Sequence, residues 1–171
     1  GSCFRKDAEA ILNESRESGS ELEILKTTLK VNESQPEKLV EILEKKTDIR
    51  GKTIAILGLA FKENTDDVRD SPAIKVIERL AKKGCIIRAY DPKASANMKN
   101  IFPEIEYAGS AADALKDADA CLILTAWSEF KNMTEKDFSS MKGSIIMEGR
   151  RVLDKNNVRG YRKACICCIS G

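Results

Sequence analysis

The feature that most constrains the fold is an alternation of short apolar runs and helical patterns across residues 53–148. The first run is apolar and rich in β-branched residues, which is typical of a buried strand, and the other three runs are interpreted as further strands. In chain order the runs are TIAILG (53–58), CIIRAY (85–90), ACLILTA (120–126) and SIIME (144–148). This order of strand and helix predicts an α/β fold, a parallel sheet flanked by helices.

Local signals mark the helices between these runs. Ser71 and Pro72 give a capping side chain followed by proline at the first helical position, and Gly84 is suited to end that helix. Two further helices are predicted near 110–116 and 134–141. Right-handed crossovers would then bring the loops that follow the strands to one edge of the sheet, where α/β proteins bind ligands.

Residues 1–46 have a different, purely helical pattern. Apolar residues recur at helical spacing, Ser20 and Glu23 have the spacing of a capping box after a break near Gly19, and Pro36 is predicted to open a further helix. The apolar stripe must pack on the rest of the chain or on a second subunit. We therefore expect a helical segment, 1–46, followed by an α/β domain, 47–171.

Composition excludes several functions. The net charge of +2 gives no reason to expect a nucleic-acid or membrane surface, and no apolar run is long enough for a membrane span. The chain has no histidine, so imidazole chemistry is excluded within it. No signal peptide is expected, and the six cysteines form no paired metal motif, which favours reduced thiols in the cytoplasm.

Cations follow two of the predicted strands. Lys62 and Arg69 lie in the loop after the first strand, which lacks the G-x-G-x-x-G spacing of a dinucleotide site, and Arg150 or Arg151 follows the fourth. Such cations suit a phosphate or a carboxamide. The alternatives are a charged surface loop held by internal salt bridges and an ordinary solvated arginine pair. Trp127, at the end of the third strand, is interpreted as a lid on the core.

Sulfur chemistry has candidates at both ends. In a helix, Cys3 and Asp7 would lie on one side with Lys6 between them in sequence, and a thiol beside a cation can ionise and act as a nucleophile. The alternative is a terminal cysteine without chemistry. ACICC (164–168) is interpreted as a buried last strand, with a metal site as a second choice.

Several stretches resemble one known family. GLAFKENTDDVRDSPAIKVIERLAKKGCIIRAYDP, ADACLILTAWSEF and EGRRVLD resemble the C-terminal third of the nucleotide-sugar 6-dehydrogenases, which oxidise UDP-glucose or GDP-mannose. SCFRKD, followed by helices and VNESQ, resembles the catalytic cysteine segment and central helical region of the same family. The similarity covers about residues 2–160, and its CF-x-KD form is nearer to the UDP-glucose branch. It implies a Rossmann-like sheet for the α/β domain.

The resemblance implies a reaction and roles for individual residues. The C6 alcohol of the sugar is oxidised to a carboxylate with two NAD, and Cys3 would capture the intermediate aldehyde as a thiohemiacetal and then a thioester. Asp7 would position or activate water. Phe61, Lys62 and Arg150 would contact the UDP-sugar. Lys6 and Arg69 would contact NAD. In this family NAD is bound mainly by another domain, which this chain lacks.

The same resemblance carries expectations for the whole protein. We expect a fragment that is inactive without the NAD domain, a homodimer through the N-terminal helices, and a place in polysaccharide biosynthesis. Two alternatives remain: a different sugar, namely GDP-mannose or a UDP-N-acetylhexosamine, and a non-enzymatic Rossmann-like interaction module. The ending YRKACICCISG departs from the family pattern, so the pairing of the last strand is left open.

Overall fold

A six-stranded, wholly parallel sheet forms the centre of the computed structural model, which describes residues 2–17, 19, 21–154, 158 and 162–165. The strand order is β3-β2-β1-β4-β5-β6, so the chain winds outward in both directions from β1 and β4. This confirms the predicted Rossmann-like class. The strands are β1 (Thr53–Leu57), β2 (Ile86–Tyr90), β3 (Glu106–Tyr107), β4 (Ala120–Ile123), β5 (Ile145–Glu148) and β6 (Arg162–Cys165).

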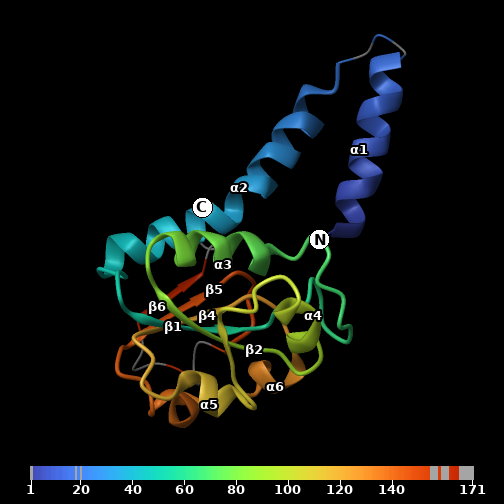
Figure 1. Ribbon diagram of the computed structural model, residues 1–171. Helices are drawn as coiled ribbons and strands as arrows, with labels where there is room; N and C mark the ends of the chain where they lie inside the picture. The colour runs from blue at the N-terminus through green and yellow to red at the C-terminus, as the bar shows by residue number, and fades with distance from the viewer. Residues whose placement is uncertain (1, 18, 20, 155–157, 159–161, 166–171) are drawn as a thin grey trace.

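Helices cover both faces of this sheet (Figure 1). The second and third helices lie on one face, and the fifth and sixth lie on the other. The helices are α1 (Ser2–Glu17), α2 (Glu23–Lys46), α3 (Pro72–Lys82), α4 (Ser95–Lys99), α5 (Ala111–Leu115) and α6 (Ser128–Lys131), with a 3₁₀ helix η1 (Glu135–Phe138). None of the helices in the described part of the chain has the length and apolar character needed to cross a membrane.

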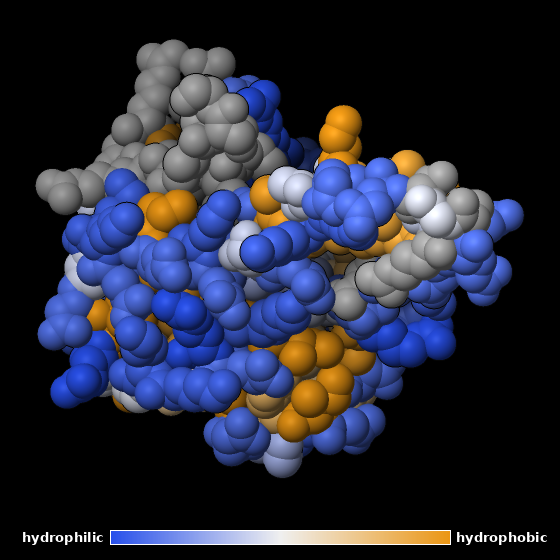
Figure 2. Space-filling model, turned by 90° about the horizontal axis from the view of Figure 1, so that it is seen from above, coloured by the Kyte–Doolittle hydropathy of each residue, from blue (hydrophilic) through white to orange (hydrophobic). Residues whose placement is uncertain are grey.

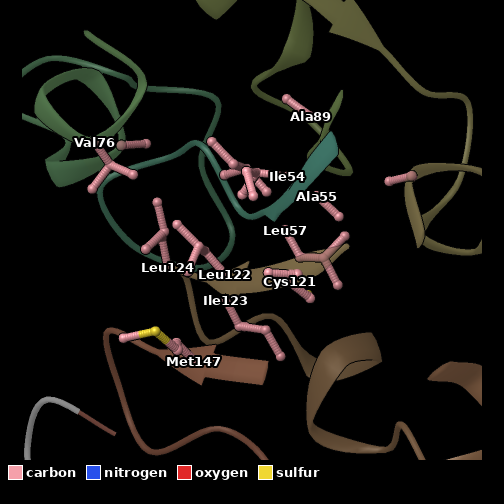
Figure 3. Packing of buried hydrophobic residues seen from close by; sticks show 14 of the residues in the cluster. Ile54, Ala55, Leu57, Val76, Ala89, Cys121, Leu122, Ile123, Leu124 and Met147 are labelled. Atoms are coloured by element: carbon pink, nitrogen blue, oxygen red, sulfur yellow. The ribbon is translucent and has the colours of Figure 1, made fainter. Parts of the chain in front are cut away.

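The core lies between the sheet and its helices. Every residue of β4 and β5 is buried, as are the last four residues of β1. Figure 3 shows Val76 of α3 turned toward the side chains of these strands. The C-terminal half of α2 joins the same core through Leu39, Val40 and Leu43, so the buried cluster continues across the expected boundary at residue 46. That boundary stays a prediction.

Ion pairs also attach α2 to α3. Arg79 of α3 lies within 4.0 Å of three α2 carboxylates, and Lys83 pairs with the last of them at 2.6 Å; the carboxylates belong to Glu37, Glu41 and Glu44. Beyond this contact, α1 and the first half of α2 lie side by side and project from the domain (Figure 1). Ile11, Ile24 and Val31 of this projecting hairpin are exposed. The face seen in Figure 2 is largely hydrophilic but also carries apolar patches.

Several local predictions are confirmed. The Ser71 hydroxyl accepts a hydrogen bond from the amide of Ala73, with Pro72 at the first turn of α3. Gly84 has φ of 75°, the left-handed conformation that ends a helix. Strands form within all four predicted runs, and the helix predicted near 110–116 is present as α5, which Ser110 caps.

Three predictions are wrong in detail. Pro36 does not open a helix but lies buried inside α2, where packing on the domain outweighs the one helical hydrogen bond that proline removes. The predicted start of the helix with Ser20 as its cap is replaced by Leu22 as the N-cap of α2, and the Leu22 side chain makes no capping bond; Ser20 itself lies outside the described residues. The helix expected at 134–141 is the shorter η1, which has a capping box formed by Thr134 and Asp137.

Three short elements were not predicted from the sequence. They are β3, α4 and α6, which are two to five residues long and too short to show a period. The last strand, β6, pairs parallel to β5, and it begins at Arg162 instead of the predicted residue 164. Residues 166–171, with Cys167 and Cys168, lie outside the described residues.

Candidate functional site

The carboxyl ends of the central strands are in register. Leu57 of β1 is paired with Ile123 of β4, and Ile123 with Glu148 of β5. Hydrogen bonds extend each pairing by one residue, from the Gly149 amide to the Ile123 carbonyl at 2.8 Å and from the Leu124 amide to the Leu57 carbonyl at 2.9 Å. Since β4 alone separates β1 from β5, the loops that follow those two strands begin about 10 Å apart.

A buried carboxylate sits where the loops after β1, β2 and β4 meet. Asp91 follows β2 and is only 4% exposed. Its two oxygens accept five N–H groups at 2.7–3.1 Å, and the donors are the amides of Leu59, Ala60, Lys93 and Ala94 and the indole of Trp127. Trp127 is thus buried at the strand ends, as predicted, but it also donates a hydrogen bond to the carboxylate.

The crevice between the loops after β1 and β4 is filled by the protein. A Cβ on Gly58, whose φ is 93°, would lie 2.6 Å from both the Thr125 amide nitrogen and the Thr125 Cβ. The Thr125 hydroxyl donates a 2.6 Å hydrogen bond to the Ala60 carbonyl. In a cofactor-binding sheet this crevice and its amides receive the pyrophosphate of NAD. The residues here do not fit that group, because the amides already bind Asp91 and the crevice is closed.

The loop after β1 carries an exposed lysine. Lys62 is exposed, and its ammonium lies 5.2 Å from the centroid of the Phe61 ring, within cation–π range. No ion pair to Lys62 is found among the residues that the structure describes. Glu63, the next residue, instead pairs with Lys131 of α6 at 2.9 Å. The loop therefore leaves one cation available at the edge of the sheet.

The other cation of this loop is engaged within the loop. The Arg69 guanidinium bonds both oxygens of Asp67, the shortest contact being 2.7 Å, although 84% of the Arg69 side chain is exposed. These bonds, and the bond from the Arg69 amide, lower the pKa of Asp67 to about 2. Internal pairing, the alternative interpretation of the loop, therefore holds for Arg69, while its outward face remains accessible.

The first turns of α1 lie near this pair. The charge of Lys6 on α1 also lowers the pKa of Asp67, by less than the bonds from Arg69, and Figure 1 shows the start of α1 beside the loop between β1 and α3. Cys3 and Asp7, four residues apart, are both in α1, so the helix that their pairing required is present. Asp7 is exposed, and the Cys3 side chain lies outside the described residues.

The loop after β5 is fixed by a second buried acid. Glu148 is 1% exposed, and its Oε1 accepts the amides of Val152 and Leu153, both at 2.7 Å. The bonds hold the turn on which Arg150 is exposed, and no ion pair to Arg150 is found in the described parts of the chain. Lys62 and Arg150 thus extend from the same edge, above strands separated only by β4. Exposed cations on two neighbouring loops of one sheet edge are suited to binding phosphate groups.

Comparison with known proteins identifies the fold and the loops together. Residues 55–155 match the model of the UDP-glucose/GDP-mannose dehydrogenase family, UDP binding domain. The chain belongs to this family. The matched residues run from β1 to the loop after β5, and they include Lys62, Arg69 and Arg150.

Individual members of the family extend the match over most of the chain. The UDP-glucose 6-dehydrogenase AglM of Haloferax volcanii is 44% identical over 94% of this chain, and YwqF of Bacillus subtilis, also a UDP-glucose 6-dehydrogenase, is 40% identical over 88%. A UDP-glucose dehydrogenase structure from Pyrobaculum islandicum superposes with a TM-score of 0.82 at 31% identity, covering 95% of this chain. The chain spans only 35–37% of the length of these relatives.

The structure brings together most, but not all, of the expected residues of this family. Lys62 and Arg150 share the sheet edge, and Lys6 lies with Arg69 at its side. Sequence reasoning missed Asp91, Thr125 and the anchoring role of Glu148. The only available signal was position, since each of the three lies at or just after the end of a strand. Among the described residues no cluster of three side chains could hold a metal ion.

Proposed function

We propose that this chain is the UDP-sugar-binding part of a UDP-glucose 6-dehydrogenase. Lys62, Phe61 and Arg150 bind the nucleotide-sugar, with the two cations on its phosphates. The single observation that supports this most is the pair of exposed cations on anchored loops at one sheet edge, in a UDP-binding domain. AglM and YwqF, at 44% and 40% identity, are UDP-glucose 6-dehydrogenases, which favours glucose as the sugar.

We assign the chemistry at the sugar C6 to α1. Cys3 is proposed as the nucleophile and Asp7 as the group that positions water, with Lys6 and Arg69 reaching toward NAD. The closed crevice after β1 does not fit the cofactor, so this proposal assigns NAD to a part of the protein outside these residues. The isolated chain should then bind nucleotide without turning over substrate.

The same proposal includes assembly and location. Homodimerisation through the hairpin of α1 and α2 is supported by its exposed Ile11, Ile24 and Val31, which a second copy would cover. A cytoplasmic location is supported by the free thiols of Cys85 and Cys121.

Titration calorimetry with UDP and UDP-glucose tests the site. We expect Lys62→Ala and Arg150→Ala each to raise the Kd for UDP about 10- to 100-fold, the effect of losing one hydrogen bond between charged groups. Lys52→Ala and Arg50→Ala are matched controls, because these cations precede β1 and lie at the opposite, amino edge of the sheet. Equal Kd values for the Lys62 and Lys52 variants would contradict the assigned site.

Two outcomes would favour the alternatives. Tighter binding of GDP-mannose or of a UDP-N-acetylhexosamine than of UDP-glucose would keep the site and change the sugar. Dimerisation without any rise in melting temperature on adding UDP would favour a non-enzymatic interaction module, because a ligand of the folded state must stabilise it.

A further inference from the structure

We infer that Asp91 is a positioning residue for nucleotide binding: its carboxylate holds the loop after β1 so that Phe61 and Lys62 face the ligand. This inference rests on the proposed function. Asp91 touches neither Lys62 nor Arg150 in the hydrogen bonds of the described residues, so its effect on a ligand is exerted through the backbone of the loop.

Asp91 connects three loops at the carboxyl edge of the sheet. One oxygen, Oδ2, accepts the amides of Leu59 and Ala60 from the loop after β1. The same oxygen accepts the Trp127 indole from the loop after β4. The other oxygen accepts the amides of the turn that follows β2. A single side chain thus fixes three loops at the proposed ligand edge. Phe61 and Lys62 are the two residues that follow Ala60, whose amide Asp91 accepts.

The hydrogen bonds at position 91 require a carboxylate. Five N–H donors converge on a buried group, and only a carboxylate offers two acceptor oxygens to them. An asparagine at position 91 would turn an NH₂ group toward one of the two sets of donors. Alanine would leave the five donors without this partner, and four of them belong to the buried residues Leu59, Ala60, Ala94 and Trp127.

The amides that Asp91 binds after β1 are not available to the phosphates of the proposed ligand. Backbone amides after the first strand are the usual phosphate donors of such sheets, but here Asp91 occupies them. Phosphate recognition must therefore depend on the long side chains beyond these amides. A lysine can deliver its charge accurately only if the backbone that carries it is fixed, and Asp91 supplies that constraint.

The test compares the 171-residue chain with Asp91→Ala, in the absence and presence of sodium formate. Removing the side chain leaves a small cavity lined by N–H donors that a formate ion can fill. Trp127 is the only tryptophan, so its fluorescence reports directly on the lost hydrogen bond. We expect a changed emission and a Kd for UDP raised about 10-fold or more, with formate partly restoring both.

The matched control is Asp119→Ala. Asp119 also accepts a backbone amide, that of Thr53 at 2.9 Å, but at the amino edge of the sheet. The Asp119→Ala variant should have a lower melting temperature than the unaltered chain and an unchanged Kd for UDP. If both aspartate variants bind UDP as the unaltered chain does, or if both lose affinity equally, Asp91 is an ordinary structural residue and the inference is overturned.

Two further measurements keep the result decisive. If Asp91→Ala does not fold, Asp91→Asn takes its place, and a Kd for UDP equal to that of the unaltered chain would overturn the inference. If the unaltered chain does not bind UDP, the proposed function fails, and amide hydrogen exchange decides the positioning role alone. Faster exchange at Phe61 and Lys62 in the variant supports that role, and unchanged exchange overturns it.

Discussion

Replacing Gly58 by alanine should destabilise the chain by about 2–5 kcal/mol, since two separate costs apply at this residue. The first is conformational, because the φ of 93° costs an L side chain about 1–2 kcal/mol. The second is steric, because the new Cβ would lie 2.6 Å from the amide nitrogen and the Cβ of Thr125. Overpacking of this kind costs about 1–3 kcal/mol.

Thr125 cannot move away cheaply. The Leu124 amide, one residue earlier, donates to the Leu57 carbonyl at 2.9 Å, which continues the pairing of β1 with β4. The Thr125 hydroxyl is held at 2.6 Å by the Ala60 carbonyl. Relief of the clash must therefore separate the two central strands or break one of these bonds, so we expect the cost to fall in the upper half of the range.

Urea denaturation of Gly58→Ala and Gly84→Ala measures the steric part by difference. Gly84 has a similar φ of 75°, but a Cβ there meets nothing within 4 Å. Alanine restricts both unfolded chains equally, so that contribution cancels. We expect a loss of about 1–2 kcal/mol for Gly84→Ala and a clearly larger loss for Gly58→Ala, with a melting temperature lowered by about 4–20 °C. Equal losses would refute the close-approach argument.

Two further predictions concern titrating groups. The bonds from Arg69 lower the pKa of Asp67 from 3.8 to about 2, so their stabilising effect is complete above the unfolded pKa and is lost as the pH falls toward 2. An NMR titration of Asp67 in Arg69→Ala should show the pKa raised toward 3.8 but still below it, because the amide of residue 69 and the charge of Lys6 remain; an unchanged pKa would contradict the assigned cause. Burial, with smaller effects of Glu44 and Asp48, raises the pKa of Cys85 to about 11, so its thiol should react slowly with iodoacetamide at mildly alkaline pH. Cys121 is fully buried and should react only when the chain unfolds. Peptide mapping after treatment measures both rates, and rapid labelling of either thiol in the folded chain would contradict this prediction.

The parts of the fold that could be predicted were those set by local sequence. β4 and β5 are buried on every residue, and such strands have continuous apolar runs that cannot be confused with an amphipathic element of the same length. The start of α3 was equally clear, because Ser71 and Pro72 act on their own backbone. The sheet edge shared by Lys62 and Arg150 followed from strand order and the handedness of crossovers alone.

The parts that could not be predicted depend on contacts between distant residues. Asp91 binds amides 31 and 32 residues before it and an indole 36 residues after it, and nothing in the sequence near Asp91 indicates five converging donors. Pro36 was misassigned for the same reason, because its helix is continued by burial against the domain. Local propensity also favours a break there, and tertiary packing overrides it.

Two buried acids would allow an edge without a phosphate-binding glycine loop to bind the diphosphate that we propose as its ligand. Asp91 and Glu148 lie at the ends of strands separated by β1 and β4, and each accepts backbone amides of a loop that carries an exposed cation of the proposed site, Lys62 or Arg150. Both acids are buried and accept hydrogen bonds from backbone amides, so they should repel an anionic ligand only weakly. Lys62 and Arg150 are exposed. In cofactor-binding sheets, backbone amides serve as the phosphate donors. Here they serve as anchors, so the proposed ligand would be bound by side chains, which can be exchanged during evolution without changing the fold.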